Sequence, residues 1–304
     1  MPEYPDIVIY IERLAALIKG QVLQKARIAS PFLLRSFDPP IGIIEQKTII
    51  GIERIGKRIV FVFENDLFLV LHLMIAGRLH WKKNGASIPV KVGMAAFDFE
   101  NGTLLLTEAG TQKRASLHLI KERNQLASFD LGGLEIFEAT LDQFQKRLVL
   151  ENHTLKRALT DPWLFSGIGN AYSDEILHRA KLSPMQLTQK MSDEQIKQLF
   201  HAIKSTLMEW TQRLRDEAGQ DFPEKVTAFH KEMAMHGKFG KPCPVCGTKV
   251  QRIRYASNET NYCPTCQTGG RLLADRALSR LLKQDWPKNL EELEEKKLRS
   301  IERR

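Results

Sequence analysis

Four cysteines, the only ones in this chain of 304 residues, form two pairs with the spacing of a zinc site. Cys243 and Cys246 make one C-x2-C turn, and Cys263 and Cys266 make the other. Each turn can direct two thiolates at one ion, and a hairpin between the turns completes a tetrahedral set of ligands. The alternative, four reduced core thiols, gives no reason for the cysteines to gather in two C-P-x-C turns. Because four sulfurs leave no open position for water or substrate, we expect one structural Zn²⁺.

The Pro2-Glu3 pair at the start of the chain is a second chemical candidate. Removal of Met1 would expose the secondary amine of Pro2, and an α-amino group has a pKa near about 8, against about 10.4 for lysine. Part of this amine is neutral near pH 7, so it can attack the C1′ carbon of a sugar, release the base and form a Schiff base. Glu3 can carry the proton that opening of the sugar ring requires. Taken alone, the pair is more typical of an ordinary exposed N-terminus.

Two further positions combine a polar side chain with a glycine-rich turn. Lys57 follows Gly56 at the head of an expected strand, and it is one of 45 lysines and arginines, most of which we expect on the surface. Asn170 ends the sequence Ser-Gly-Ile-Gly-Asn over residues 166–170, between two helical stretches. There it either caps a helix or, together with backbone N–H groups, binds a phosphate.

The composition restricts the class of protein. With 43% hydrophobic residues, the chain can build two globular domains. No apolar run approaches the roughly 20 residues that span a bilayer, and the N-terminus lacks the features of a secretory signal. We therefore expect an intracellular protein, cytoplasmic or associated with the nucleoid, with no membrane partner. The formal net charge of +9 favours a polyanionic partner, of which nucleic acid is the leading candidate.

The elements that must position these residues follow from periodicity. Apolar residues at helical spacing predict a helix over 7–19. Short β-branched and aromatic runs then predict paired strands from 21 to about 130, among them 59–63 and 67–71. Asn101-Gly102 predicts a two-residue hairpin turn. This part of the chain is therefore expected to fold as an antiparallel β-sandwich with a flanking helix.

The strand pattern stops near residues 131–133, and a capping box over 140–143 opens a helical region. Helical periodicity includes 193–214 and, beyond the cysteines, 272–282. The expected fold class is α+β and multidomain. Its domains are a β-sandwich over 1–133, a helical domain over 134–240, a zinc hairpin over 241–270, and a charged tail, helical or partly disordered, over 271–304.

The order of these features resembles the formamidopyrimidine-DNA glycosylase and endonuclease VIII family. Pro2-Glu3, Gly56-Lys57, the 167–170 turn and the four-cysteine ribbon follow one another from residue 2 to about 267, which leaves the last 37 residues uncovered. The resemblance implies a helix-two-turns-helix motif and a bifunctional enzyme of base-excision repair. Such an enzyme flips a damaged base from double-stranded DNA, cleaves its glycosidic bond and nicks the abasic strand by elimination. We expect it to act as a monomer.

The resemblance assigns roles residue by residue. Pro2 is the nucleophile, Glu3 the proton donor, and Lys57 both a phosphate contact and the acid of the elimination step. Asn170 is a phosphate ligand in the helix-two-turns-helix motif. Lys238 belongs to the lead-in to the zinc finger and is expected to contact DNA.

The zinc hairpin departs from the family pattern. Asn258 stands where members usually carry the arginine that grips phosphates, and Arg252 or Arg254 on the same hairpin is expected to compensate. If catalysis is lost, the alternative is a catalytically weak protein that binds damaged DNA on the same scaffold. A zinc ribbon that binds RNA or protein would require the N-terminal matches to be accidental.

The positions that fill the void left by a flipped base also differ. Where members typically carry methionine, arginine and phenylalanine, this chain has Ile75, Lys113 and Ala115. Of these, we expect Lys113 to contact DNA, whereas an alanine cannot wedge a base step. Asp6 replaces the usual glutamate, and the connection after residue 216 is short for a loop that covers an oxidised purine. We therefore expect a substrate other than 8-oxoguanine, such as an oxidised pyrimidine or an abasic site.

Overall fold

The computed structural model describes residues 1–255, 258–274 and 285–302. It forms two compact units, residues 1–133 with 207–228 and residues 134–206 with 229–304. The helical domain expected over 134–240 is therefore divided, because the second half of a long helix packs with the N-terminal unit. Each unit is described separately below.

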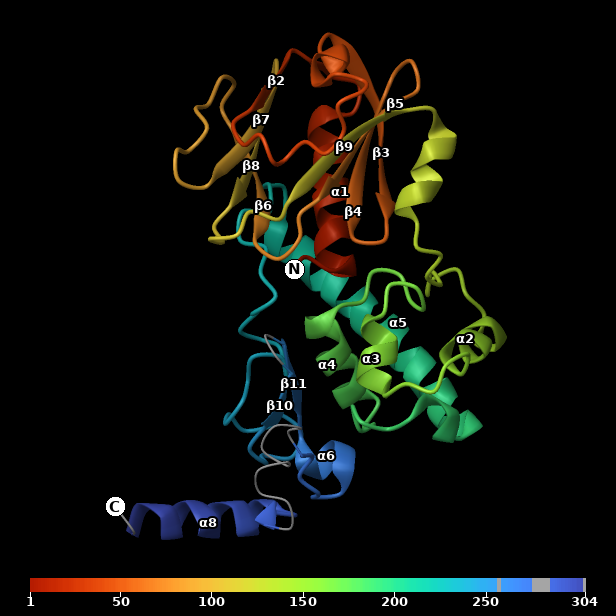
Figure 1. The fold of residues 1–304 in the computed structure, drawn as a ribbon, viewed down its shortest axis with the longest axis vertical. Coiled ribbons are helices and arrows are strands. Elements are labelled where there is room, and N and C mark those ends of the chain that lie inside the picture. The colour runs from red at the N-terminus through yellow and green to blue at the C-terminus, as the bar shows by residue number, and fades with distance from the viewer. Residues whose placement is uncertain (256–257, 275–284, 303–304) are drawn as a thin grey trace. The chain divides into compact units, whose positions relative to one another are not determined.

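The first unit is an antiparallel β-sandwich (Figure 1). One sheet has the strand order β1-β3-β4-β5-β9, and the other has the order β2-β7-β8-β6. Its helical elements are α1 (Tyr4–Ile18), η1 (Ile41–Ile44) and η2 (Arg123–Phe129). Its strands are β1 (Val22–Leu23), β2 (Lys25–Ile28), β3 (Lys47–Ile55), β4 (Arg58–Phe63), β5 (Leu67–His72), β6 (Gly77–Lys82), β7 (Gly93–Phe99), β8 (Gly102–Glu108) and β9 (Ser116–Lys121). The helix predicted near the N-terminus and the strands predicted after it are confirmed.

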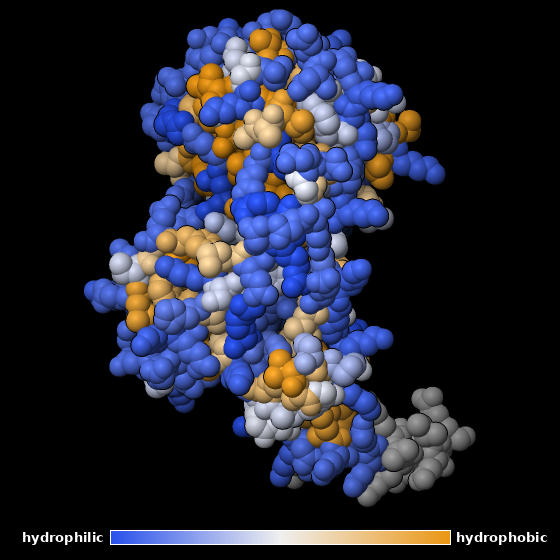
Figure 2. Space-filling view, turned by 180° about the vertical axis from the view of Figure 1, so that it is seen from behind, coloured by the Kyte–Doolittle hydropathy of each residue, from blue (hydrophilic) through white to orange (hydrophobic). Residues whose placement is uncertain are grey.

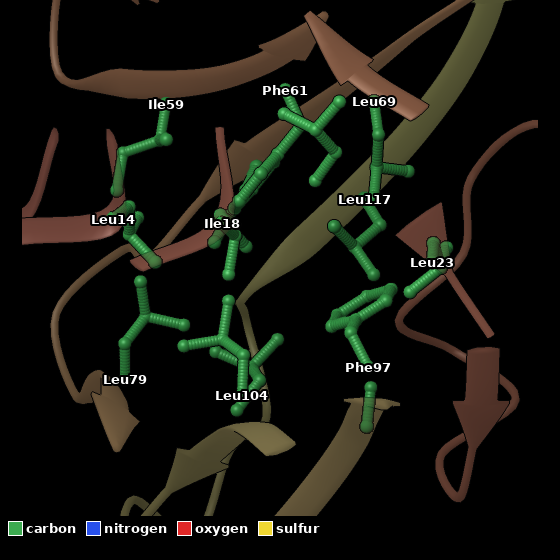
Figure 3. Packing of buried hydrophobic residues seen from close by; sticks show 14 of the residues in the cluster. Leu14, Ile18, Leu23, Ile59, Phe61, Leu69, Leu79, Phe97, Leu104 and Leu117 are labelled. Carbon is green, nitrogen blue, oxygen red and sulfur yellow. The ribbon is translucent and has the colours of Figure 1, made fainter. Parts of the chain in front are cut away.

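Helix α1 packs within the core of this unit. Figure 3 shows Leu14 of α1 with Ile59 and Phe61 of one sheet on one side and Leu79 and Leu104 of the other sheet nearby. All five side chains are buried, and full burial of each contributes about 1.5–3 kcal/mol. Contacts with both sheets fix the helix, and therefore also the chemical groups at its first turn.

The predicted hairpin between β7 and β8 is present, with its loop one residue earlier than expected. Phe99 pairs with Gly102, so Glu100 and Asn101 form the loop. Gly102 is required for a different reason, since a Cβ there would collide with the Trp81 ring. The sequence signal was correct, but packing against a distant aromatic ring explains the glycine.

The second unit contains helices and the zinc ribbon. Its elements are α2 (Leu141–Leu148), α3 (Leu155–Thr160), α4 (Asn170–Arg179), η3 (Thr188–Lys190), the first half of α5 (Asp193–Ala218), β10 (Gln251–Tyr255), β11 (Asn258–Tyr262), α6 (Pro264–Thr268) and α8 (Leu290–Glu302). The predicted capping box opens α2, because Thr140 and Gln143 exchange hydrogen bonds between backbone N–H groups and side-chain oxygens. The helix expected over 272–282 lies mostly outside the described residues, whereas the charged tail is helical in α8.

The surface carries mainly polar side chains. Figure 2 shows one face on which hydrophilic residues dominate and hydrophobic residues occur in small separate groups. Lysines and arginines outnumber acidic residues 45 to 36, so the chain as a whole has a formal net charge of +9. Within the described ranges, no helix combines the length and the hydropathy needed to cross a bilayer.

Candidate active site and zinc module

The N-terminus of the chain leads directly into α1. Glu3 is the N-cap residue of this helix and only 2% of its surface is exposed. One turn further along, the Asp6 carboxylate accepts the backbone N–H of Glu3 at 2.8 Å. Pro2 is also buried. This helix cap holds the first residues in one defined conformation, as a reaction at the chain terminus would require.

Burial of the N-terminus favours an uncharged amine, and two nearby cations act in the same direction. Burial lowers the pKa of the α-amino group of Met1, which precedes Pro2, and the carboxylates of Glu3 and Asp6 oppose that shift. The cationic side chains of Arg78 and Lys57 lower the same pKa. Burial also raises the pKa of Asp6 to about 7, which reduces the negative charge that would otherwise retain a proton on the amine. An amine needs its neutral form to act as a nucleophile.

Lys57 lies in the tight turn between β3 and β4. Ile55 pairs with Arg58 across the turn, and Gly56 has a φ of +58°, which two-residue hairpin turns favour. Burial lowers the pKa of the Lys57 ammonium, and the charge of Glu3 opposes the shift. The structure therefore places Glu3 and Lys57 in one electrostatic group with the chain terminus that precedes Pro2.

His72 belongs to the same group and is a residue that the motifs did not reveal. It ends β5 and pairs with Arg58 of β4. Burial lowers the pKa of His72 to about 4, and the nearby charges of Arg58 and Lys57 act in the same direction. The cations that lower the pKa of His72 would attract an anionic ligand, and such a ligand would in turn raise that pKa. In the sequence, the available signal was a single polar residue at the end of the apolar run 67–71.

Arg78 on β6 is a second functional candidate that the motifs missed. Its guanidinium donates to the backbone oxygens of Ile75 at 3.3 Å, Gly77 at 2.6 Å and Val226 at 2.5 Å. These bonds anchor a cation that acts on the N-terminal amine. The alternation of Arg78 with the buried Leu79 marks it as a residue on the opposite face of the strand.

The three expected void-filling positions differ in exposure. Ile75 has 58% of its surface exposed, whereas Ala115 has 1% exposed and belongs to the hydrophobic core. The side-chain amine of Lys113 donates to the backbone oxygen of Glu108. The Glu108 carboxylate in turn accepts the backbone N–H of Ala115 at 3.1 Å. Of the three, Ile75 is therefore the exposed apolar side chain.

A cavity of about 320 Å³ opens beside Asp6, lined partly by the segment that follows α5. Phe222 in that segment lines the cavity, as does Glu224. The Glu224 carboxylate binds His80 Nδ1 at 2.5 Å and accepts from Lys82 Nζ at 3.0 Å. These interactions hold the short connection against the sandwich and place acidic groups at the cavity wall.

Asn170 is the first residue of α4 in the second unit, and Gly169 is its N-cap. Gly167, in the preceding turn, has a φ of +80°, which glycine adopts without strain. The Asn170 side-chain amide donates to the backbone oxygen of Glu259 on β11 at 3.0 Å, and Lys156 Nζ donates to the Asn170 backbone oxygen at 2.7 Å. The residue predicted to bind phosphate therefore also joins the helix start to the zinc hairpin.

The zinc hairpin consists of β10 and β11. Arg252 forms an ion pair with Glu259 at 3.2 Å, and its guanidinium lies 4.1 Å from the centre of the Phe239 ring. Arg254 and Asn258 are exposed near the tip. Arg254 is therefore better placed than Arg252 to supply the cation that the family pattern has at position 258.

The four cysteines meet the geometric requirements of one zinc site. Their sulfur atoms all lie within 4.8 Å of one another. The Cys243 and Cys266 sulfurs are 3.9 Å apart, and those of Cys246 and Cys263 are 3.4 Å apart. Four sulfurs at about 2.3 Å from a tetrahedral ion would be separated by about 3.8 Å. These residues form a structural zinc site, with a sulfur donor set that suits Zn²⁺ and leaves no coordination position open.

The predicted residues are distributed over both units. The first unit holds the catalytic group and Lys113, and the second holds the hairpin residues, Asn170 and Lys238. Lys238 is half-buried and its Nζ donates to the backbone oxygen of Lys231 at 2.6 Å. Its amine is therefore engaged within the lead-in to the zinc module.

Sequence comparisons match each part of the chain to a domain of one family. Residues 1–112 match the formamidopyrimidine-DNA glycosylase N-terminal domain, and residues 135–216 match the formamidopyrimidine-DNA glycosylase H2TH domain. Residues 240–269 match the zinc finger found in FPG and IleRS. The three matches occur in the order that the sequence motifs predicted.

Individual relatives and solved structures come from the same family as these domain matches. An uncharacterised formamidopyrimidine-DNA glycosylase-like protein of Mycobacterium tuberculosis is 40% identical over 151 residues, which are 50% of this chain and 94% of that protein. The formamidopyrimidine-DNA glycosylase of Thermus thermophilus is 29% identical over 278 residues, 89% of this chain and 100% of the relative. A solved complex of the Lactococcus lactis enzyme with DNA that contains an oxidised pyrimidine has 26% identity and a TM-score of 0.78, covering 88% of this chain and 100% of that one. The chain belongs to the formamidopyrimidine-DNA glycosylase family.

Proposed function

We propose that this protein is a bifunctional DNA glycosylase and abasic-site lyase that acts, as a monomer, on damaged double-stranded DNA. The observation that carries this proposal is the electrostatic setting of the chain terminus: burial and the nearby cations Arg78 and Lys57 lower the pKa of the Met1 α-amino group, and they would act in the same way on the amine of Pro2 once Met1 is removed. A neutral amine at the start of a fixed helix is a nucleophile positioned for attack. The glycosylase names of the relatives and the solved complex with damaged DNA support the choice of substrate.

The proposed reaction uses three residues of the first unit. Once Met1 is removed, the Pro2 nitrogen attacks C1′ of the damaged nucleotide, and the base leaves with the electrons of the glycosidic bond. Glu3 donates a proton to O4′ as the C1′–O4′ bond opens, and the nitrogen lone pair forms the C=N bond of an iminium ion. Loss of a C2′ proton then expels the 3′ phosphate by β-elimination. Lys57, whose pKa burial lowers, contacts a phosphate and serves as the acid of this step.

The remaining polar residues are proposed to hold the DNA backbone. Lys57 and His72 form a phosphate site in the first unit, where the surrounding charges are cationic. In the second unit, Asn170 at the start of α4 and Arg254 near the hairpin tip contact further phosphates. Lys113, Lys238, Arg252 and Asn258 complete the proposed DNA-binding residues. Contacts of this kind position the strand and leave the choice of lesion to the cavity and loops.

DNA binding is expected to strengthen as the pH falls, because phosphate binding raises the pKa of His72 from its free value of about 4. His72 is then protonated more readily in the complex than in the free protein. The DNA affinity therefore begins to rise as the pH falls below the pKa of His72 in the complex, and it stops rising below about pH 4, where His72 is protonated in both states. If the bound state has an ordinary histidine pKa of about 6.5, affinity rises about tenfold between pH 8 and pH 5.5. Fluorescence anisotropy at constant salt measures this effect. In His72→Gln, which retains an N–H donor, the slope should flatten, and an unchanged slope would remove His72 from the phosphate site.

The protein is expected to excise an oxidised pyrimidine faster than 8-oxoguanine. Ala115 is buried and cannot enter the base stack, which leaves Ile75 as the exposed apolar wedge. The segment around Glu224 is held by His80 and Lys82, which limits its movement over a large purine. Single-turnover excision in two duplexes that differ only in the lesion measures the preference. Equal or faster excision of 8-oxoguanine would contradict it.

Borohydride trapping tests the proposed function directly. Reduction during reaction with a duplex that contains one abasic site should convert the iminium ion into a stable amine. Mass spectrometry of the digested adduct should locate the DNA remnant on the N-terminal peptide, at Pro2. If duplex DNA binds and no adduct forms, the protein is instead a damaged-DNA-binding protein on the same scaffold.

A further inference from the structure

One face of α4 contacts the zinc module through polar side chains spaced four residues apart. Asn170 donates to the backbone oxygen of Glu259, as described above. Asp174, one turn further along, accepts from Asn261 Nδ2 at 3.3 Å. His178 occupies the next turn of the same face. Because residues at i, i+4 and i+8 lie along one side of a helix, these three side chains form a continuous row.

His178 ends this row at a zinc ligand. Its Nε2 lies 3.3 Å from the Sγ of Cys243. The exposed fractions are 7% for His178 and 2% for Cys243, so water competes little for this contact. No coordination position in the four-sulfur site is open to the imidazole. His178 can therefore influence the ion only through its contact with Cys243.

The chemistry of the bound ion fixes the direction of this hydrogen bond. A cysteine that binds zinc does so as a thiolate, which has no proton to donate. The hydrogen must therefore be on the imidazole, which requires a proton on Nε2 of His178. An N–H···S bond of this kind spreads the negative charge of the thiolate and orients the ligand.

We propose that His178 is a positioning residue of the zinc site, which donates a hydrogen bond from Nε2 to the zinc-bound thiolate of Cys243 and tightens the hold on the ion. Outer residues that orient metal ligands commonly change metal affinity by about 10–100-fold when they are replaced. The proposal depends on the zinc module and is independent of the glycosylase activity. It also means that the helix that begins with Asn170 is tied directly to the metal centre.

Competition for zinc with a chelator of known affinity tests the proposal. His178→Phe keeps a buried planar ring without a donor, and it should lower zinc affinity about 10–100-fold. His178→Gln restores a side-chain N–H and should recover part of the affinity. His201→Gln, at an exposed position of α5, is the matched control and should match the unmodified protein. Equal affinities for His178→Phe and the unmodified protein would overturn the proposal.

Two spectroscopic measurements separate a hydrogen bond from a general loss of stability. In the Co²⁺-substituted protein, the hydrogen bond stabilises the sulfur lone pair, so its removal in His178→Phe should move the thiolate-to-cobalt charge-transfer band to longer wavelength. An unshifted band would count against the proposal. In the unmodified zinc protein, long-range ¹H–¹⁵N correlation should show His178 protonated on Nε2. Protonation on Nδ1 alone would overturn the proposal without any variant.

Discussion

A form of the protein that retains Met1 is expected to give no borohydride-stable adduct with a duplex that contains one abasic site. In that form, the Pro2 nitrogen is part of an amide and has no lone pair for attack. The free amine is carried by Met1, displaced by one residue or about 3.8 Å of chain. Since an error of about 1 Å in the position of a reacting group can cost about 10²-fold, we expect single-turnover adduct formation to fall by at least about 10³-fold.

The surroundings of the N-terminus explain why no other amine should replace it. The Asp6 carboxylate fixes the Glu3 backbone, and burial of Glu3 limits the room in which the terminus can move. Lys57 lies in the same electrostatic group, yet its amine extends from the turn between β3 and β4, so it does not occupy the position of the chain terminus. The measurement is the rate of adduct formation on a denaturing gel, with the Met1-retaining form prepared by inhibition of methionine removal.

Glu3→Gln provides the control for this experiment. Without the carboxylic acid, excision of a damaged base should fall by about 10²–10⁴-fold, because proton donation to the opening sugar is lost. A preformed abasic site has already lost its base and exists partly in its open form, so trapping on it should persist in the variant. If the Met1-retaining form binds duplex DNA normally and still gives the usual yield of adduct, another nucleophile performs the reaction.

Local sequence signals predicted the elements of this protein well. The apolar spacing of Ile7, Leu14 and Ile18 predicted α1, and the exchange of hydrogen bonds between Thr140 and Gln143 at the start of α2 was expected from the capping-box pattern. Both signals are local, because helical periodicity and capping depend on residues within a few positions of one another. The two C-x2-C turns predicted the zinc site for the same reason.

Contacts between distant residues were not predictable in this way. His72 joins the catalytic group only because β5 pairs with β4 in a register that places it opposite Arg58. Arg78 reaches the segment after α5 through the backbone oxygen of Val226, 148 residues away in the sequence. Residues 207–228 fold with the first unit for a comparable reason, since Arg215 binds Glu12 of α1 at 2.7 Å. Register and long-range ion pairs depend on the folded chain as a whole.

Replacement of Cys263 by serine is expected to remove the zinc ion and unfold the module over residues 240–269. Among the residues that the structure describes, the buried apolar cluster around the cysteines is small, with Met235, Cys243, Val250 and Cys263 at its centre. So few residues cannot offset the entropy of ordering about thirty positions, whereas binding of a structural zinc contributes roughly 10–16 kcal/mol. A metallochromic indicator measures zinc content, and circular dichroism should show loss of the hairpin.

Loss of the hairpin should reduce the salt dependence of DNA binding, and the size of that reduction measures how many phosphates the hairpin contacts. The arginines at positions 252 and 254 are both on β10, so an unfolded module removes two cations from the proposed interface. Each lost phosphate contact reduces the slope of log affinity against log salt by about one, so we expect the slope for Cys263→Ser to fall by about two. Val245→Ser alters an exposed position in the first C-x2-C turn without touching a ligand, and it should retain both zinc and slope. A Cys263→Ser protein that lost zinc but kept the full salt dependence would place the DNA contacts elsewhere, because the hairpin could not then be holding phosphates.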